Sequence, residues 1–171
     1  CRRIPGLASC KPTRVRVSSI ARGRQHANTN GDSPTAPASP RFVDGPTGGL
    51  EDYGVYAGPV LEVLKARGLT ARLLENEGLG AVRAALARGN PVIAWITYNC
   101  LAGSPTTVTI ADQAVTLVAN QHAVVLTGYT EAGVWANDPW DGLEDFYADS
   151  DLERSMAYFG HMAIEVGPPA E

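Results

Sequence analysis

The sequence has few cysteines, no long apolar run and no metal-binding pattern, and each absence excludes a class of protein. Its three cysteines, Cys1, Cys10 and Cys100, are too few and odd in number for a disulfide framework. None belongs to a Cys-X-X-Cys or a His/Cys cluster, so we expect no metal and no cofactor. No apolar stretch approaches the roughly 18 residues of a membrane-spanning helix, so we expect no membrane segment.

The composition is that of a globular domain, but its charge is unevenly distributed. Hydrophobic residues make up 44% and charged residues 19% of the 171 residues, which suits one domain with a core. Residues 1–41 hold eight of the fourteen lysines and arginines and a single acid, Asp32. A basic arm of this kind can bind nucleic acid. Because no aromatic residues interleave with the arginines, we expect no nucleic-acid partner.

The N-terminal segment differs in amino-acid composition from the rest of the chain. The chain starts at Cys1, and residues 1–25 are rich in arginine and lack an apolar stretch, so no signal peptide is visible. If an upstream signal has been removed, we expect a secreted or cell-envelope protein. We expect a basic, poorly patterned segment over residues 1–41, a folded domain over residues 42–166 and a tail over residues 167–171.

The apolar pattern predicts helices followed by mostly antiparallel strands. Apolar residues at helical spacing predict helices over residues 57–67, 79–88 and 150–159. Short runs rich in β-branched and aromatic residues predict strands over residues 70–74, 91–98, 106–110, 114–118, 122–129, 134–137, 146–147 and 162–166. Because the helices and the strands are largely segregated along the chain, the fold class is α+β.

His122 and Asp138 lie at the ends of two strands joined by a short turn. His122 begins the strand over 122–129, and Asp138 follows the strand over 134–137 in the motif Asn-Asp-Pro-Trp. A turn over 130–133 places both residues at the same end of the sheet and, with one common turn length, on the same face. A carboxylate that accepts the imidazole Nδ1–H orients the ring and stabilises the imidazolium. The two residues thus match the base and the orienting acid that a thiol or hydroxyl nucleophile requires.

Simpler structural roles are open for both residues, and the nucleophile must be chosen separately. His122 also fits a strand-edge histidine bonded to a loop, and Asp138 fits an Asx-turn. Cys10 precedes Pro12, which suits the first turn of a helix whose N-terminus would favour a thiolate. Cys100 follows a buried strand, as a packed thiol does, and Cys1 has no sequence before it. Cys10 is therefore the candidate nucleophile.

Five segments carry a family pattern. They are Tyr-Gly-Val-Tyr-Ala-Gly-Pro-Val (53–60), Gly-Asn-Pro-Val-Ile-Ala-Trp-Ile (89–96), His-Ala-Val-Val-Leu-Thr-Gly-Tyr (122–129), Val-Trp-Ala-Asn-Asp-Pro-Trp-Asp-Gly (134–142) and Phe-Gly-His-Met-Ala-Ile-Glu-Val (159–166). In this order, over about residues 42–166, they resemble the bacterial cysteine peptidases of the bacteriocin-processing, family-39-like type.

The resemblance implies a papain-like fold and a thiol peptidase that hydrolyses a peptide or protein substrate. It implies that Cys10 is the nucleophile, His122 the general base and Asp138 the orienting acid. The stretch after Cys10 departs from the family pattern because it is rich in Arg, Val and Ser, and no Gln stands shortly before Cys10 as an oxyanion donor. A catalytically inactive peptidase-like domain that binds peptides is the alternative.

Overall fold

The structure, a computed structural model, describes residues 55–110 and 113–169, which form three α-helices, one 3-10 helix and eight strands. The α-helices are α1 (Ala57–Ala66), α2 (Gly78–Ala87) and α3 (Asp149–Ala157), and the 3-10 helix is η1 (Tyr98–Cys100). The strands are β1 (Leu69–Leu74), β2 (Val92–Thr97), β3 (Pro105–Ile110), β4 (Gln113–Val118), β5 (Gln121–Tyr129), β6 (Gly133–Asn137), β7 (Glu144–Ala148) and β8 (Ala163–Pro169). The predicted segment over 1–41 and its boundary at residue 42 lie outside the described residues.

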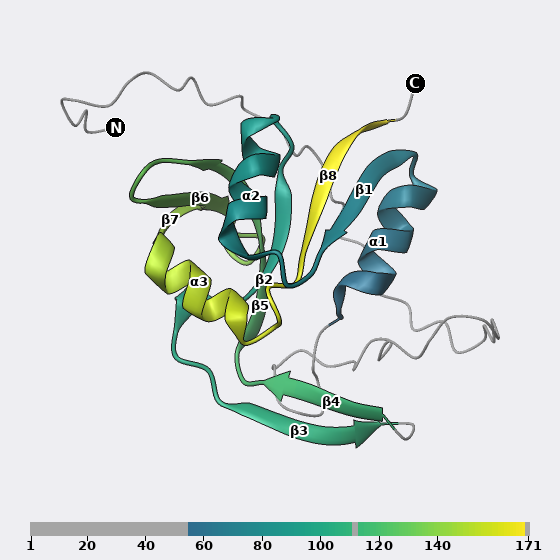
Figure 1. The fold of residues 1–171 in the computed structure, drawn as a ribbon, viewed down its shortest axis with the longest axis vertical. Helices are drawn as coiled ribbons and strands as arrows, with labels where there is room; N and C mark the ends of the chain where they lie inside the picture. Colours follow the sequence, from purple (N-terminus) through teal and green to yellow (C-terminus); the bar gives the residue numbers. More distant parts are fainter. Residues whose placement is uncertain (1–54, 111–112, 170–171) are drawn as a thin grey trace. The chain divides into compact units, whose positions relative to one another are not determined.

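Six of these strands form one sheet in the order β1-β8-β2-β5-β6-β7, in which every neighbouring pair is antiparallel. The other two, β3 and β4, pair with each other as a separate two-stranded ribbon between β2 and β5 in the chain (Figure 1). The predicted α+β class, with helices packed on a mainly antiparallel sheet, is confirmed. Because β5 pairs with both β2 and β6, the strand that begins near His122 lies inside the sheet and not at its edge.

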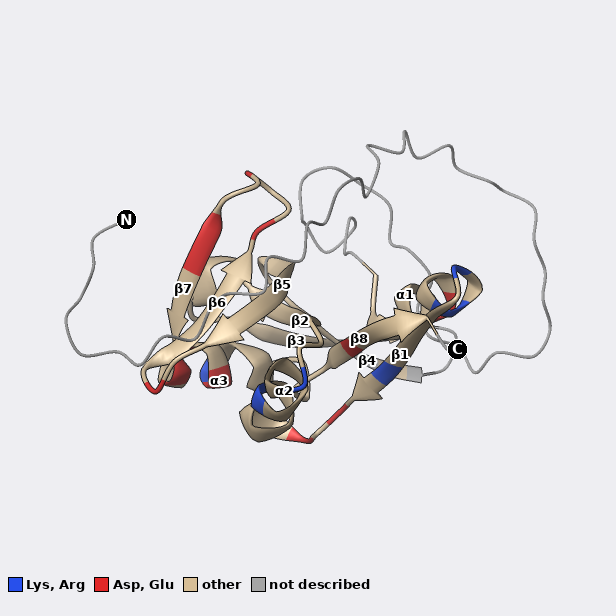
Figure 2. Cartoon of the chain, turned by 90° about the horizontal axis from the view of Figure 1, so that it is seen from above, with Lys and Arg blue, Asp and Glu red and all other residues tan. Residues whose placement is uncertain are grey.

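Helices cover both faces of this sheet. Along β2 the side chains alternate: Val92, Ala94 and Ile96 join the cluster with α2 and α3, while Trp95 joins the cluster with α1. In Figure 2, α2 and α3 lie on one side of the sheet and α1 on the other. β2 therefore faces core on both sides, which explains why its sequence is a continuous apolar run.

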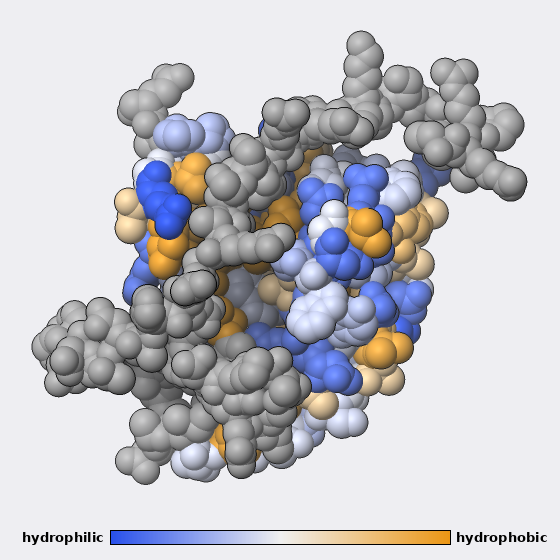
Figure 3. Space-filling model, turned by 180° about the vertical axis from the view of Figure 1, so that it is seen from behind, coloured by the Kyte–Doolittle hydropathy of each residue, from blue (hydrophilic) through white to orange (hydrophobic). Residues whose placement is uncertain are grey.

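The surface of the described part is mixed in polarity and charge. Acidic residues gather on β7 and in the loop before it, whereas lysines and arginines lie on β1 and the helices (Figure 2). On the face seen in Figure 3, the visible apolar residues form separate patches between polar ones. Within residues 55–110 and 113–169, no helix has the length and apolar character to cross a bilayer.

Candidate active site

The pairing of β5 with β6 brings His122 and Asp138 to the same end of the sheet. His122 is the second residue of β5, and Asp138 comes directly after β6. Val125 lies opposite Asn137, so the next residue, Asp138, continues to a position opposite Val124. Val124 and His122 are two residues apart on one strand and share a face. Asp138 is therefore a diagonal neighbour of His122, within reach of its side chain.

A hydrogen bond joins the two side chains. The Nε2 atom of His122 lies 2.8 Å from Oδ1 of Asp138. The Asp138 residue is 3% exposed, and the His122 side chain is 14% exposed. Because water has little access to this pair, the bond between the carboxylate and the ring is stronger than it would be at the surface.

The loop after β6 holds the Asp138 carboxylate in place. The same Oδ1 atom accepts a second hydrogen bond from the backbone N–H of Trp140, at 2.7 Å. The backbone of Asp138 is also tied down, since its N–H donates to Leu143 and its carbonyl accepts from Gly142, both at 2.9 Å. The Asx-turn considered as an alternative for Asp138 is thus present together with the histidine contact, and it fixes the carboxylate that faces His122.

The nitrogen that meets the carboxylate differs from the expected one. The sequence-based interpretation placed Nδ1–H on the carboxylate, but the contact is made by Nε2. Strand spacing determines whether two side chains reach each other, whereas the side-chain rotamer determines which edge of the imidazole turns toward the partner. Because Asp138 engages Nε2, Nδ1 is the ring nitrogen that does not contact this carboxylate.

Tyr98 and a small pocket lie next to His122. The Tyr98 ring stands edge-on to the imidazole, with the ring centroids 5.5 Å apart and the planes at 74°. A pocket of about 230 Å³ lies beside the histidine and is lined by mostly apolar residues, among them Trp95, Ile93 and Gln121. The sequence interpretation did not single out Tyr98, and the only signal was an aromatic residue at the end of the apolar run over 91–98.

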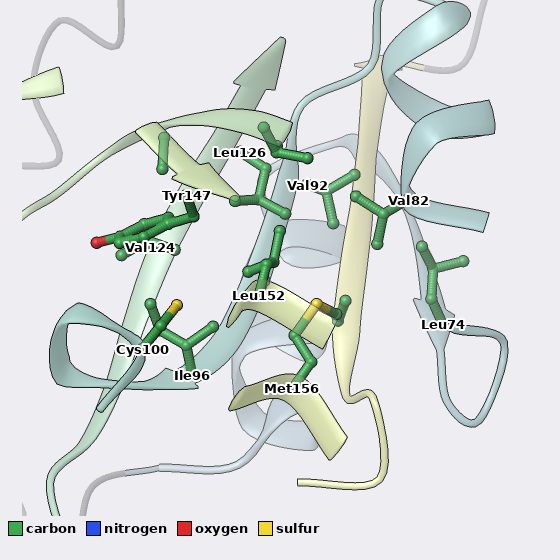
Figure 4. Close-up of a cluster of buried hydrophobic side chains, with 14 of the residues drawn as sticks. Leu74, Val82, Val92, Ile96, Cys100, Val124, Leu126, Tyr147, Leu152 and Met156 are labelled. Carbon is green, nitrogen blue, oxygen red and sulfur yellow. The ribbon is translucent and has the colours of Figure 1, made fainter. Parts of the chain in front are cut away.

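The structure places one of the three cysteines, and it lies in the core. Cys1 and the candidate nucleophile Cys10 lie outside the described residues. Cys100 is 3% exposed, and Figure 4 shows its sulfur within the apolar cluster near Ile96 and Tyr147. Burial raises the pKa of the Cys100 thiol to about 11. This thiol is therefore protonated at neutral pH and lacks the character of an activated nucleophile.

Two acidic residues at the start of α3 form ion pairs with arginines. Asp149 pairs with Arg83 at 2.5 Å, and Asp151 pairs with Arg154 at 2.9 Å. Among the residues that the structure describes, no three His, Cys, Asp or Glu side chains are grouped as a metal ion would require.

The chain matches the sequence pattern of a known family and is similar to a solved structure. The Peptidase_C39 like family matches the chain over residues 4–164. The crystal structure of a Bacillus anthracis protein, assigned there as a C39-like peptidase, is similar with a TM-score of 0.63 and 25% sequence identity. The similarity covers 70% of this chain and 62% of that chain, so this chain spans less than two thirds of its length. Among curated proteins no sequence matches the chain.

Proposed function

The chain belongs to the C39-like peptidase family, and on this premise we propose that it is a cysteine peptidase with a triad of Cys10, His122 and Asp138. The observation that carries the proposal is the hydrogen bond between Nε2 of His122 and the buried carboxylate of Asp138, at 2.8 Å. That bond holds Nε2 on the carboxylate and leaves Nδ1 for proton transfer, which is what a thiol nucleophile requires of its base.

The choice of Cys10 rests on chain order and on elimination. A papain-like site takes its nucleophile from a position before the histidine and the acid, as the resemblance implies. The family match begins at residue 4, so it includes Cys10 but not Cys1. Cys100 is buried in the core with a raised pKa. Cys10 is thus the cysteine that fits the role.

The proposed reaction proceeds in two halves. His122 takes the proton of the Cys10 thiol, and the thiolate sulfur bonds to the carbonyl carbon of the substrate. The C–N bond then breaks, and His122 gives its proton to the leaving amine, so that a thioester remains. His122 next takes a proton from water, and the resulting hydroxide attacks the thioester. The C–S bond breaks to release a carboxylic acid, and His122 returns its proton to the Cys10 thiolate, which restores the free thiol. Asp138 keeps its bond to Nε2 and stabilises the imidazolium.

Alkylation kinetics test the nucleophile without knowledge of the substrate. The intact protein is treated with iodoacetamide at about pH 6–7, where an activated thiolate reacts and an ordinary thiol reacts slowly. Peptide mapping should show Cys10 labelled faster than Cys100, and His122→Ala should slow the labelling of Cys10. His161→Ala is the matched control, because His161 pairs with Glu153 at 2.9 Å and not with Asp138. Equal labelling of Cys10 and Cys100 contradicts the proposal.

Turnover tests the activity itself. A proteome-derived peptide library is incubated with the wild type, with Cys10→Ser and with His122→Ala, and new peptide termini are identified by mass spectrometry. We expect cleavage by the wild type and none by either variant. Cleavage that survives Cys10→Ser would exclude Cys10 as the nucleophile. Retention of library peptides without cleavage would favour the inactive, peptide-binding alternative.

A further inference from the structure

Tyr98 contacts His122 from outside the hairpin that carries the His122–Asp138 pair. The two rings meet edge-on, at 5.5 Å between centroids and 74° between planes. Tyr98 is 38% exposed, so burial in the core does not hold it there. Its backbone N–H donates to the carbonyl of Asn120 at 2.8 Å, which ties Tyr98 to the segment two residues before His122. The backbone that carries this ring is therefore tied to the segment just before His122.

The backbone that presents Tyr98 is strained. Directly after it, Asn99 and Cys100 both have left-handed conformations, with φ of 51° and 53°. Residues with a side chain rarely adopt this conformation, and two in succession persist only where the surroundings impose them. Strained backbone of this kind is found at functional sites, where it positions a side chain.

Contacts from the end of β2 and from α3 hold this turn. The Thr97 hydroxyl donates to the carbonyl of Leu101 at 2.5 Å, and it also contacts the Ser155 hydroxyl of α3 at 2.8 Å. Arg154 of the same helix donates to the carbonyl of Cys100 at 3.0 Å. Thr97 and Ser155 are fully buried, so α3 and the end of β2 clamp both ends of the turn. The turn is thus a rigid support for the ring that it carries.

We propose that Tyr98 is a positioning residue, which holds the His122 imidazole so that Nδ1 faces the nucleophile. A single hydrogen bond to Asp138 fixes one atom of the ring but leaves the ring free to tilt about that bond. The T-shaped contact with the Tyr98 ring restricts this freedom, because T-shaped packing has a preferred geometry. The inference rests on the proposed function, since it assigns Tyr98 a role in the same site.

The state of the His122 ring gives a test that needs no substrate. In protein labelled with ¹⁵N-histidine, long-range proton–nitrogen spectra report the tautomer and mobility of each ring, and His122→Ala assigns the signals. For the wild type and Tyr98→Phe we expect one well-defined set of His122 ring signals, with a proton held on Nε2 by Asp138. For Tyr98→Ala and Tyr98→Leu we expect broadened signals or a mixture of ring states. Tyr129→Ala is the matched control, because Tyr129 is also 38% exposed but packs under Arg83.

Kinetics on a peptide cleaved by the wild type add a second measurement. Loss of the edge-on contact should lower kcat roughly two- to tenfold in Tyr98→Ala, with little change in KM, and Tyr98→Phe should restore kcat. A His122 spectrum in both Tyr98→Ala and Tyr98→Leu that equals the wild-type spectrum would overturn the inference. A Tyr98→Phe spectrum that differs from the wild-type spectrum as much as that of Tyr98→Ala would also overturn it. A wild type without turnover would count against the proposed function, while the ring spectra would still decide the role of Tyr98.

Discussion

The substitution Glu165→Gln tests how much one buried carboxylate stabilises the contacts between β1, β8 and the segment that enters β2. Glu165 lies on β8, and its side chain is 8% exposed. Its carboxylate accepts hydrogen bonds from Arg88 at 2.8 and 3.1 Å, from Arg72 at 3.1 and 3.2 Å and from Asn90 at 2.8 Å. These donors come from β1 and from the end of α2 and the loop after it. One carboxylate therefore joins β1, β8 and the entry to β2.

The expected loss of folding free energy depends on how far the partners of Glu165 are exposed to water. A hydrogen bond to a charged group contributes about 1.5–3 kcal/mol, but a pair with an exposed arginine contributes about 0–1 kcal/mol. The arginine side chains are 53% and 51% exposed, so water screens their share, whereas Glu165 itself is shielded. We expect Glu165→Gln to lower the free energy of unfolding by about 2 kcal/mol and the melting temperature by about 4–8 °C.

The same substitution makes a prediction about pH. Burial raises the pKa of Glu165, but the hydrogen bonds from Asn90, Arg88 and Arg72 outweigh burial and leave the pKa below its ordinary value of 4.5. A carboxyl with a lowered pKa in the folded state stabilises the fold above its unfolded pKa, and this stabilisation is lost as the pH falls through the folded pKa. The difference between wild type and Glu165→Gln should be full near neutral pH and should shrink below about pH 4.

Urea unfolding at several pH values measures this difference. The midpoint should fall while the dependence on urea concentration stays the same, since the native surface is unchanged. Glu77→Gln is the control, because Glu77 also pairs with Arg72 but is 43% exposed, and its substitution should cost less than about 0.5 kcal/mol. A loss for Glu165→Gln no greater than for Glu77→Gln would refute the reasoning.

Three further predictions concern the site and the core. Asp138→Ala should lower kcat/KM about 10- to 100-fold. Asp138→Asn keeps an acceptor oxygen and should lower kcat/KM less. Equal activity of the wild type and both variants in a peptide-cleavage assay would contradict this. Burial raises the pKa of Cys100 above its ordinary value of 9.0. The buried, protonated thiol therefore contributes its full share to the stability of the fold below pH 9.0, and this contribution is lost as the pH rises through about 11. The stability difference between wild type and Cys100→Ala in urea should therefore narrow over that range, and a constant difference would argue against it. Gly133→Ala should cost about 1–3 kcal/mol in the same assay, because the added Cβ would lie 2.2 Å from the carbonyl oxygen of Tyr147. Gly80→Ala, where the Cβ meets nothing within 4 Å, should not destabilise the protein.

Much of the fold could be predicted because its strands are set by local pattern. The apolar run over 91–98 predicted a buried strand, and β2 is that strand at the middle of the sheet. The prediction was wrong at Tyr98, where the chain enters η1. The turn depends on the bond of Thr97 to Leu101 and on the clamp from α3, and neither is visible in local propensity. The last strand was also longer than predicted, because β8 gains pairing with β1 as far as Pro169.

The site was predictable where it depends on a hairpin and not where it depends on side-chain rotamers or distant packing. The hairpin predicted that His122 and Asp138 lie at the same end of the sheet, and the structure brings their side chains to 2.8 Å. The choice of ring nitrogen depends on a rotamer, and the approach of Tyr98 depends on a turn in another part of the chain. Cys10 and the roles of all three triad residues stay predictions.

A β-bulge decides which face of the sheet Asp138 occupies. At the turn end of the hairpin, Gly128 lies opposite Trp135, but the register shifts across Thr127, so that Val125 lies opposite Asn137. In the unshifted register Asp138 would lie opposite Val125, whose side chain points away from the face of His122. The single extra residue moves Asp138 opposite Val124 and onto the face of His122. The turn length alone would have placed the carboxylate on the opposite face, so the His122–Asp138 contact depends on the bulge at Thr127.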